Sequence, residues 1–349
     1  MFNKELLKAP FNSKEYNFLV DIPFLNNNIF YLTVGGSRSY GTNTPESDYD
    51  LRGAFIESPR NLISLEKPIE EYIETETDSC IYSLNKWVRL LASCNPNVIE
   101  MLGSREEDIV YINEIGKLLR ENYRLFLSQK AYYTFSGYAT QQLRRLQNAL
   151  ARDEYSQSDK ERHIKKTIEM DILAAGKPFN MYLLAREEMD NSESKFDISL
   201  DVRPSKNEEF EEEIFINGNM VNLPLRDFLK LNSQMQNTIK NYGKLTQRNK
   251  KKDALHLNKH AMHLIRLYYM GIDILKNGEI VTYREKEHDL LMSIRNGELP
   301  YEKIFEMQKK LEAEMETARS ETKLLEKVDM DKINDLLMEI YSKTYKMGV

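Results

Sequence analysis

Two short groups of residues near the N-terminus are of types that can bind phosphate and metal ions. Gly35, Gly36 and Ser37 follow an apolar run. A tight turn of glycines lets backbone N–H groups approach phosphate oxygens that a side chain would obstruct. Asp48 and Asp50 stand at the start of the next apolar run. Carboxylates at positions i and i+2 of a strand project from the same face, so both can reach one metal ion.

Backbone that holds phosphate, followed by an oxygen-only carboxylate pair, is what Mg²⁺ with a nucleoside triphosphate (NTP) needs. Mg²⁺ accepts one or two protein carboxylates and fills its octahedral shell with water and substrate phosphates. Each group alone is common in turns and on surfaces. Ten residues separate Ser37 from Asp48, and each group adjoins a predicted strand, so the two together indicate a site for Mg²⁺ and an NTP.

Short strands and a helix must position these residues. The apolar run at 29–34 predicts a buried strand, and 49–56 predicts a second one. Residues 70–81 alternate loosely in the manner of a strand. Apolar residues recur at helical spacing over 84–91 until a proline ends that helix. The first hundred residues are therefore predicted to form a small mixed β-sheet with helices.

From about residue 112 the pattern becomes helical. A β-hairpin about an Asn217-Gly218 turn interrupts it, close to the acidic run 208–213. The chain is thus predicted to be α+β, with an N-terminal domain at 1–125 and a mostly helical domain at 126–349 that carries the hairpin insertion around 190–223. The predicted helices span 113–127, 129–152, 158–175, 177–189, 224–242, 253–277, 285–296, 301–318 and 330–346.

Composition narrows the class of protein and of partner. The chain has 349 residues, of which 41% are hydrophobic, a formal net charge of −6 and two cysteines. It has neither the cysteine content of a disulfide scaffold nor an apolar run long enough to cross a membrane, so we expect a soluble, cytoplasmic protein. With this net charge, a nucleic acid would have to be bound by a local basic segment or through metal ions.

The segment 34–53 (VGGSRSYGTNTPESDYDLRG) resembles the signature of the DNA polymerase β-like nucleotidyltransferase superfamily. That signature is a hydrophobic residue, Gly-Gly/Ser, a spacer and Asp-hydrophobic-Asp. The segment is similar to a narrower branch, the predicted nucleotidyltransferases of bacteria and phages that are often encoded beside RNA ligases. Segments 95–102, 135–143 and 259–299 also resemble this branch, so the resemblance touches both predicted domains.

The resemblance implies a two-metal transfer of a nucleoside monophosphate from an NTP to an acceptor hydroxyl, with release of pyrophosphate. Asp48 and Asp50 would bind two Mg²⁺ ions, for which Mn²⁺ can substitute, together with a third catalytic carboxylate. The candidates Glu74, Glu76 and Asp78 alternate on one stretch, so spacing alone places all three on one face. The resemblance favours Asp78 and then Glu76. The alternative is that all three are solvated charges of an edge strand.

The resemblance also assigns the residues that would contact the NTP. Gly35, Gly36 and Ser37 would hold the triphosphate through backbone N–H groups and the hydroxyl. Arg38 and Arg52 would neutralise its charge. In the helical part, the resemblance places Lys259, His260, His263 and Arg266 on the helix that closes over the nucleotide, as phosphate or substrate contacts. Tyr138 is a further candidate contact, as an aromatic ring suited to base stacking.

Three features of the helical part have alternative interpretations. The basic segment 244–266 is a candidate for contact with RNA phosphates, or a plain solvated face. His256, His260 and His263 share one helical face, where packing or substrate contact is favoured over zinc because no cysteine or carboxylate completes a set. Tyr138 lies in a stretch rich in tyrosine and arginine, which suits either base stacking or half-buried packing.

Three functions fit these residues. The first is addition of nucleotides to an RNA 3′ end, with a tRNA-like end in repair as the favoured acceptor and ATP or another NTP as the donor. The second is nucleotidyl transfer to a protein side chain or a small molecule. The third is a non-catalytic nucleotide-binding module, which the joint presence of Gly36, Ser37, Asp48 and Asp50 argues against. Spacing leaves the NTP, the use of a template and the oligomeric state open.

Overall fold

The computed structural model describes the chain as two compact units. One unit comprises residues 1–143 and 254–349, and the other comprises residues 144–253. The single boundary at residue 125, expected from the change in periodicity, stays a prediction. The structure describes residues 2–65, 67–154, 158, 161, 162, 164, 165, 195–205, 212–221, 225, 226, 228, 229, 232, 233, 235, 236 and 254–345.

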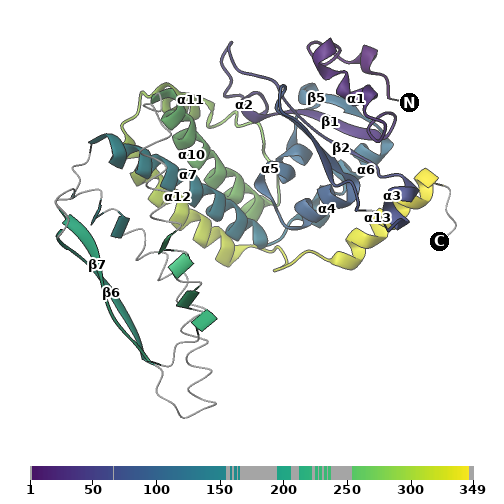
Figure 1. Cartoon of the computed structure of the whole chain (residues 1–349). Helices are drawn as coiled ribbons and strands as arrows, with labels where there is room; N and C mark the ends of the chain where they lie inside the picture. Colours follow the sequence, from purple (N-terminus) through teal and green to yellow (C-terminus); the bar gives the residue numbers. More distant parts are fainter. Residues whose placement is uncertain are drawn as a thin grey trace. The chain divides into compact units, whose positions relative to one another are not determined.

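Within the described part of the first unit, a five-stranded mixed sheet has the strand order β3-β4-β2-β1-β5 (Figure 1). Strand β1 is antiparallel to β2 and β5, β4 is parallel to β2, and β3 is antiparallel to β4. This arrangement confirms the predicted mixed sheet. The strands are β1 (Ile29–Gly35), β2 (Asp50–Phe55), β3 (Glu71–Glu74), β4 (Ser79–Ser83) and β5 (Ile109–Ile112).

The predicted strands agree with the sheet in two places and differ in a third. The runs at 29–34 and 49–56 correspond to β1 and β2. The alternating stretch 70–81 is instead two strands, β3 and β4, separated by a turn at 75–78. The alternation of side chains along the sequence cannot reveal such a turn, because four turn residues between two antiparallel strands preserve a period of two.

Strand β1 is buried along its whole length and has a core on each face. On one face, Leu32 and Val34 pack against apolar side chains of the N-terminal segment, including Phe18 and Leu19. On the other face, the Tyr31 ring stacks on Trp87 of α4 (Leu84–Ala92), with the ring centroids 5.5 Å apart. Successive strand residues point to opposite faces, so a single strand supports both layers.

The helical part of this unit is built around a buried helix, α10. Figure 1 shows α7, α10 and α12 side by side, and a side chain at Gly271 of α10 would meet Phe135 of α7 and Met315 of α12. No helix in the described part of the chain combines the length and apolar character needed to span a membrane. The long helices are α7 (Lys130–Glu154), α10 (Ala254–Asn277), α11 (His288–Asn296), α12 (Tyr301–Glu321) and α13 (Met330–Tyr345).

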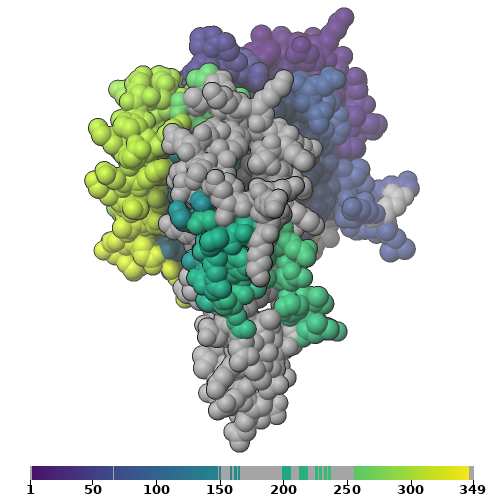
Figure 2. Space-filling model, turned by 60° about the vertical axis from the view of Figure 1, so that its left-hand side comes forward, coloured from purple at the N-terminus to yellow at the C-terminus, as the bar shows by residue number. Residues whose placement is uncertain are grey.

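Helix α12 is amphipathic. Its buried side includes Ile304, Leu311 and Met315, whereas its yellow-green atoms form much of one side of the surface in Figure 2. The shorter helices of this unit are η1 (Lys4–Leu6), η2 (Lys14–Tyr16), α1 (Phe18–Asp21), α2 (Gly36–Ser39), α3 (Pro59–Ile63), α5 (Pro96–Ile99), η3 (Glu100–Gly103), η4 (Glu106–Asp108), α6 (Glu114–Glu121) and η5 (Tyr123–Phe126).

The second unit contains a long antiparallel hairpin of β6 (Lys195–Pro204) and β7 (Glu212–Val221). A hairpin is therefore present where one was predicted, but its turn is not at Asn217-Gly218. These two residues lie inside β7, opposite Ser199 and Ile198. A turn there would leave only a few residues for each strand, whereas the observed register pairs all ten residues of each strand. The predicted helix at 177–189 lies outside the described residues.

The burial of Trp87 leads to a test of the core. We expect Trp87→Ala to lower the free energy of unfolding by about 3–5 kcal/mol, because a large cavity replaces a fully buried ring. Trp87→Phe should cost clearly less, since the indole N–H has no hydrogen-bond partner to lose. Trp87 is the only tryptophan, so urea unfolding should be followed by circular dichroism. Equal losses for the two variants would contradict this packing.

Candidate active site

The two glycines at the end of β1 allow an unusually close approach of β2. Gly35 pairs with Asp50 across the two strands, and Gly36 has a φ of +62°. A Cβ atom on Gly36 would lie 1.7 Å from Asp50 Oδ2, and one on Gly35 would lie 2.8 Å from Arg52 Cγ. Only glycine fits at Gly36, beside the Asp50 carboxylate. Ser37 follows it in the first turn of α2.

Asp50, Arg52 and Asp78 come together where two parallel strands begin. Arg52 of β2 pairs with Cys80 of β4. Asp50 lies two residues before Arg52, and Asp78 lies two residues before Cys80. Arg52 Nη2 lies 3.8 Å from Asp50 Oδ1 and 3.4 Å from Asp78 Oδ1, and Arg52 Nη1 donates to the backbone carbonyl of Asp78. Asp48 lies in the exposed loop before β2, and its charge adds to the effect of burial in raising the pKa of Asp50, so a shared face for the two carboxylates stays a prediction.

The turn between β3 and β4 separates the three candidates for the third carboxylate. Glu74 ends β3 and accepts hydrogen bonds from the Tyr72 hydroxyl and the Glu76 backbone N–H. Asp78 lies in the turn with a φ of +43° and contacts Arg52. The three residues do not share a strand face, contrary to the spacing argument. Of the three, Asp78 is the residue that contacts Arg52 and so lies near the start of β2. This contact supports the choice of Asp78 as the third carboxylate.

The surroundings of Asp50 disfavour its charged form. Burial raises the pKa of Asp50 to about 6, the hydrogen bond and charge of Asp78 add to this effect, and the Arg52 guanidinium opposes it. Two carboxyl groups in contact repel when both are ionised, and a divalent cation would relieve that repulsion. Within the described residues, no three His, Cys, Asp or Glu side chains already form a metal cluster. The oxygen-only pair and the accessible Asp48 nevertheless fit the chemistry of Mg²⁺.

Arg38 holds the loop that carries Asp48. Its Nη2 donates to the carbonyl of Ser47 at 2.6 Å, and its Nε donates to the carbonyl of Asp48 at 3.2 Å. The guanidinium also lies 3.8 Å above the ring of Tyr49. Arg38 is thus engaged with the backbone of the loop, and it sets the path of the chain into β2.

A buried network joins α2 to α10. The hydroxyl of Tyr40, the residue after α2, donates to Glu100 Oε1 at 2.7 Å, and Arg266 Nη1 donates to Glu100 Oε2 at 3.1 Å. The Arg266 guanidinium lies 3.5 Å above the Tyr40 ring. The His263 ring meets the same tyrosine edge-on, and its surroundings, burial first and nearby cations second, lower the pKa of His263 to about 3. Arg266, predicted to contact the nucleotide, is therefore committed to an interior ion pair.

Sequence reasoning missed Glu100. Its signal was an acidic residue inside the apolar run 98–102, within a segment already noted for its resemblance to nucleotidyltransferases. A carboxylate that is only 8% exposed needs a partner, and here it has both an arginine and a tyrosine.

The remaining predicted contacts lie on α7 and α10. The Tyr138 hydroxyl accepts a hydrogen bond from Asn95 Nδ2 at 3.3 Å, and its side chain is half-buried. Lys259 is exposed on α10. Among the described residues, no hydrogen bond or ion pair joins either side chain to Asp50 or Asp78. The basic residues at 244–252 lie outside the described residues, whereas the rest of that segment forms the start of α10.

The three histidines of α10 have different surroundings. His256 is exposed, His260 Nδ1 lies 2.8 Å from Gln142 Oε1, and His263 packs on Tyr40. They form no metal-binding group among the residues that the structure covers. The preference for packing or substrate contact over zinc stays a prediction.

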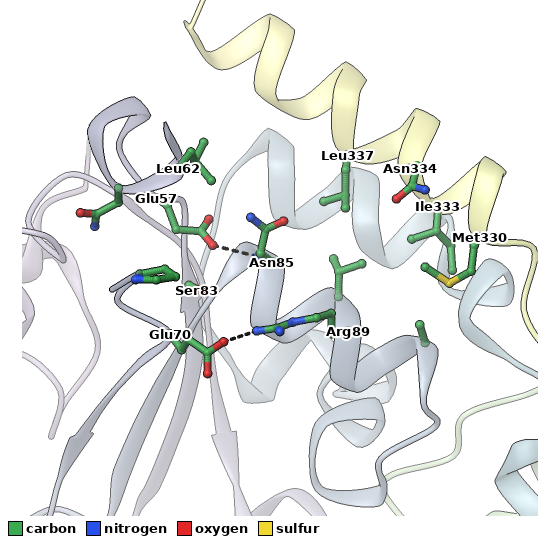
Figure 3. A pocket seen from close by; sticks show the side chains of 14 residues that line it. Glu57, Leu62, Glu70, Ser83, Asn85, Arg89, Met330, Ile333, Asn334 and Leu337 are labelled. Atoms are coloured by element: carbon green, nitrogen blue, oxygen red, sulfur yellow. Dashed lines mark hydrogen bonds and ion pairs between the residues drawn. The ribbon is translucent and has the colours of Figure 1, made fainter. Parts of the chain in front are cut away.

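A cavity of about 360 Å³ lies beyond the end of β2 that is farther from Asp50 (Figure 3). Strand β2 runs away from Asp50, and Glu57, two residues after its end, lines this cavity together with residues of α4 and α13. The Glu57 carboxylate accepts hydrogen bonds from the Asn85 backbone N–H at 3.0 Å and the Tyr341 hydroxyl at 2.8 Å. None of the predicted site residues lines the cavity, so it is separate from the candidate active site.

The buried ion pair predicts a large loss of stability for one substitution. Arg266→Met leaves the Glu100 carboxylate buried without its cation and should cost about 3–5 kcal/mol of unfolding free energy. Glu100→Gln added to this variant should restore part of the loss, because the unpaired charge is removed. Urea unfolding of the wild type, both single variants and the double variant measures the coupling. Additive losses would show that the two side chains do not form a pair.

The raised pKa of Asp50 predicts a pH dependence in metal-free buffer. Between about pH 4 and pH 6 the folded protein retains a proton that the unfolded chain has lost, so stability falls as the pH rises through this window. The amide of Asp50→Asn does not ionise, so the stability of this variant should not fall in this pH window. It should exceed that of the wild type by about 1–3 kcal/mol at neutral to alkaline pH. The difference should vanish at about pH 4. Parallel stability curves for the two proteins, measured with EDTA present, would contradict the assignment.

Comparisons with known proteins agree with this geometry. The model of the RNA repair pathway DNA polymerase beta family matches residues 12–168, which include the whole sheet. The uncharacterized protein YcgL of Bacillus subtilis (strain 168) is 36% identical over 86 residues, which are 24% of this chain and 32% of the relative. The chain thus matches about a third of that relative's length. No solved structure gives a significant match. The family match confirms the resemblance inferred from the sequence: over residues 12–168, this chain is similar to the polymerase β-like nucleotidyltransferases of the RNA repair branch.

Proposed function

We propose that this chain is a Mg²⁺-dependent nucleotidyltransferase that moves a nucleoside monophosphate from an NTP to an acceptor hydroxyl and releases pyrophosphate. The observation that carries this proposal is the contact of Arg52 with both Asp50 and Asp78, directly against the Gly36 turn. It brings a candidate phosphate-binding turn and two candidate metal ligands to one place. The family matched by residues 12–168 suggests the same class of reaction.

In this proposal Asp48, Asp50 and Asp78 bind two Mg²⁺ ions. When bound, such ions lower the pKa of the acceptor hydroxyl and stabilise the charge on the attacking and leaving oxygens. Arg52 keeps two of the carboxylates beside each other and reduces their repulsion. Arg38 keeps the loop of Asp48 in place through its backbone carbonyls.

The triphosphate is assigned to the turn at the end of β1. Gly35, Gly36 and Ser37 would offer backbone N–H groups and a hydroxyl, and the positive φ of Gly36 is of the kind found in turns that bind anions. Tyr138, Lys259 and His263 stay candidate contacts of the substrate. For Arg266, the pairing with Glu100 supports a positioning role, since it holds Tyr40 and with it the end of α2.

We propose an RNA 3′ end, such as a tRNA-like end in need of repair, as the acceptor. Support comes from the family description, which names an RNA repair pathway, and from the basic segment 244–266. A protein side chain or a small molecule would use the same chemistry at the phosphorus and is the alternative acceptor.

The test is a transfer assay with Mg²⁺ and each α-labelled NTP, offered separately with tRNA, with bulk protein and with no acceptor. We expect label on the RNA 3′ end. Asp50→Asn and Asp78→Asn should each reduce transfer by more than about 100-fold, beyond the usual cost of losing an outer-shell partner of a metal site. Glu74→Gln and Glu76→Gln are matched controls from the same hairpin and should retain activity.

Each outcome is informative. Label found only on polypeptide would overturn the RNA acceptor but keep the transferase. Transfer that persists when Asp48→Asn and Asp50→Asn are combined would show that the metal ligands are wrongly assigned. Loss of activity in Glu76→Gln but not in Asp78→Asn would show that Glu76, and not Asp78, is the third carboxylate.

A further inference from the structure

Arg295 of α11 is a buried cation that pairs with no carboxylate among the residues that the structure describes. Arg295 is only 6% exposed to solvent. In the described part of the chain, its guanidinium makes one hydrogen bond, from Nη2 to Ser47 Oγ at 3.3 Å, and no ion pair. Burial lowers the pKa of Arg295, and no carboxylate opposes that effect. A buried charge without a partner is costly, so such a residue needs a reason.

Arg284 provides the comparison. It is 3% exposed and its guanidinium pairs with two carboxylates, those of Asp273 and Glu287. Within the described part of the chain, the fold therefore supplies carboxylates to one buried arginine, Arg284, but none to Arg295.

The guanidinium of Arg295 is still accessible to a ligand. The buried side-chain nitrogens and oxygens without a partner, within the described residues, belong to Ser13, Trp87 and Arg266. The N–H groups of Arg295 that do not bind Ser47 are absent from this set, although they too lack a protein partner. They therefore retain some exposure and can donate to an added acceptor.

The position of Arg295 links it to the candidate active site. Ser47 immediately precedes Asp48, and its carbonyl accepts a hydrogen bond from Arg38. Two guanidinium groups, from α2 and α11, thus converge on the loop that leads into β2. Burial and then the charges of Arg266, Arg295 and Lys259 lower the pKa of His263, so these cations of the helical part lie near one another. Glu46 and Asp48 flank Ser47 in the loop.

We propose that Arg295 binds the polyphosphate of the NTP, and that the helical part thereby contributes a cation to the triphosphate site. A guanidinium can donate two parallel hydrogen bonds to a phosphate and stays charged when desolvated. A bound phosphate would supply the negative charge that pairs with the Arg295 guanidinium. This proposal rests on the proposed function, because it takes the nucleotide as the source of the phosphate.

The first experiment measures anion binding without nucleotide or metal. In EDTA, sodium tripolyphosphate should raise the melting temperature of the wild type, and Arg295→Met should abolish this shift. Without ligand, Arg295→Met should melt at the wild-type temperature or above, because an uncompensated charge is removed. Arg284→Met is the matched control: it should melt lower, since two carboxylates lose their cation, and should keep a tripolyphosphate shift.

The second experiment measures nucleotide binding by titration calorimetry. Arg295→Met should weaken binding of the NTP by at least about 10-fold, as expected for a charged hydrogen bond. Binding of the corresponding nucleoside, which has no phosphate, should not change. Arg295→Lys should restore part of the affinity, because it keeps the charge but not the paired donors.

The outcomes separate this proposal from the proposed function. If the wild type transfers nucleotides and Arg295→Met binds NTP and tripolyphosphate like the wild type, the role of Arg295 is wrong and the function stands. If Arg295→Met loses affinity for RNA but not for NTP, the anion is an RNA phosphate and the proposal is overturned. If tripolyphosphate binding depends on Arg295 but no NTP is ever transferred, the function is wrong and the anion site remains.

Discussion

The contact between the Asp50 carboxylate and the backbone of Gly36 is the constraint on which the candidate site depends. No side chain fits between them, so the end of β1 and the start of β2 approach each other only because the turn is glycine. This approach puts a candidate phosphate-binding turn beside a carboxylate. It also aligns Arg52, two residues further along β2, with the start of β4 and Asp78.

The site is electrostatically unfavourable as it stands, and the surrounding fold tolerates this. One carboxyl group has a raised pKa because it is buried against another, and an arginine nearby is buried without a carboxylate. Both groups would be stabilised by what a nucleotidyltransferase binds, a divalent cation and a polyphosphate. The apolar layers on both faces of β1, with Trp87 on one side and the N-terminal segment on the other, provide stability that does not depend on those ligands.

The helical part is connected to the site through interior polar contacts. Glu100 receives hydrogen bonds from Tyr40 beside α2 and from Arg266 of α10, so it connects these two helices. Arg295 makes a second connection, to the loop before β2. The helices therefore hold two of the loops that form the candidate site.

The sequence by itself determined the features that depend on near neighbours in the chain: the strands around the glycine turn, the motif of Asp48 and Asp50, the mixed sheet with a helical continuation, and the presence of a hairpin in the insertion. Only the tertiary structure decided which carboxylate joins Asp50, because a turn hidden in an alternating stretch separates Asp78 from Glu74. It also decided that Arg266 faces Glu100, 166 residues away, and that Arg295 has no carboxylate. Periodicity records which face a residue occupies, whereas the partner of a charge depends on which distant segments the fold brings together.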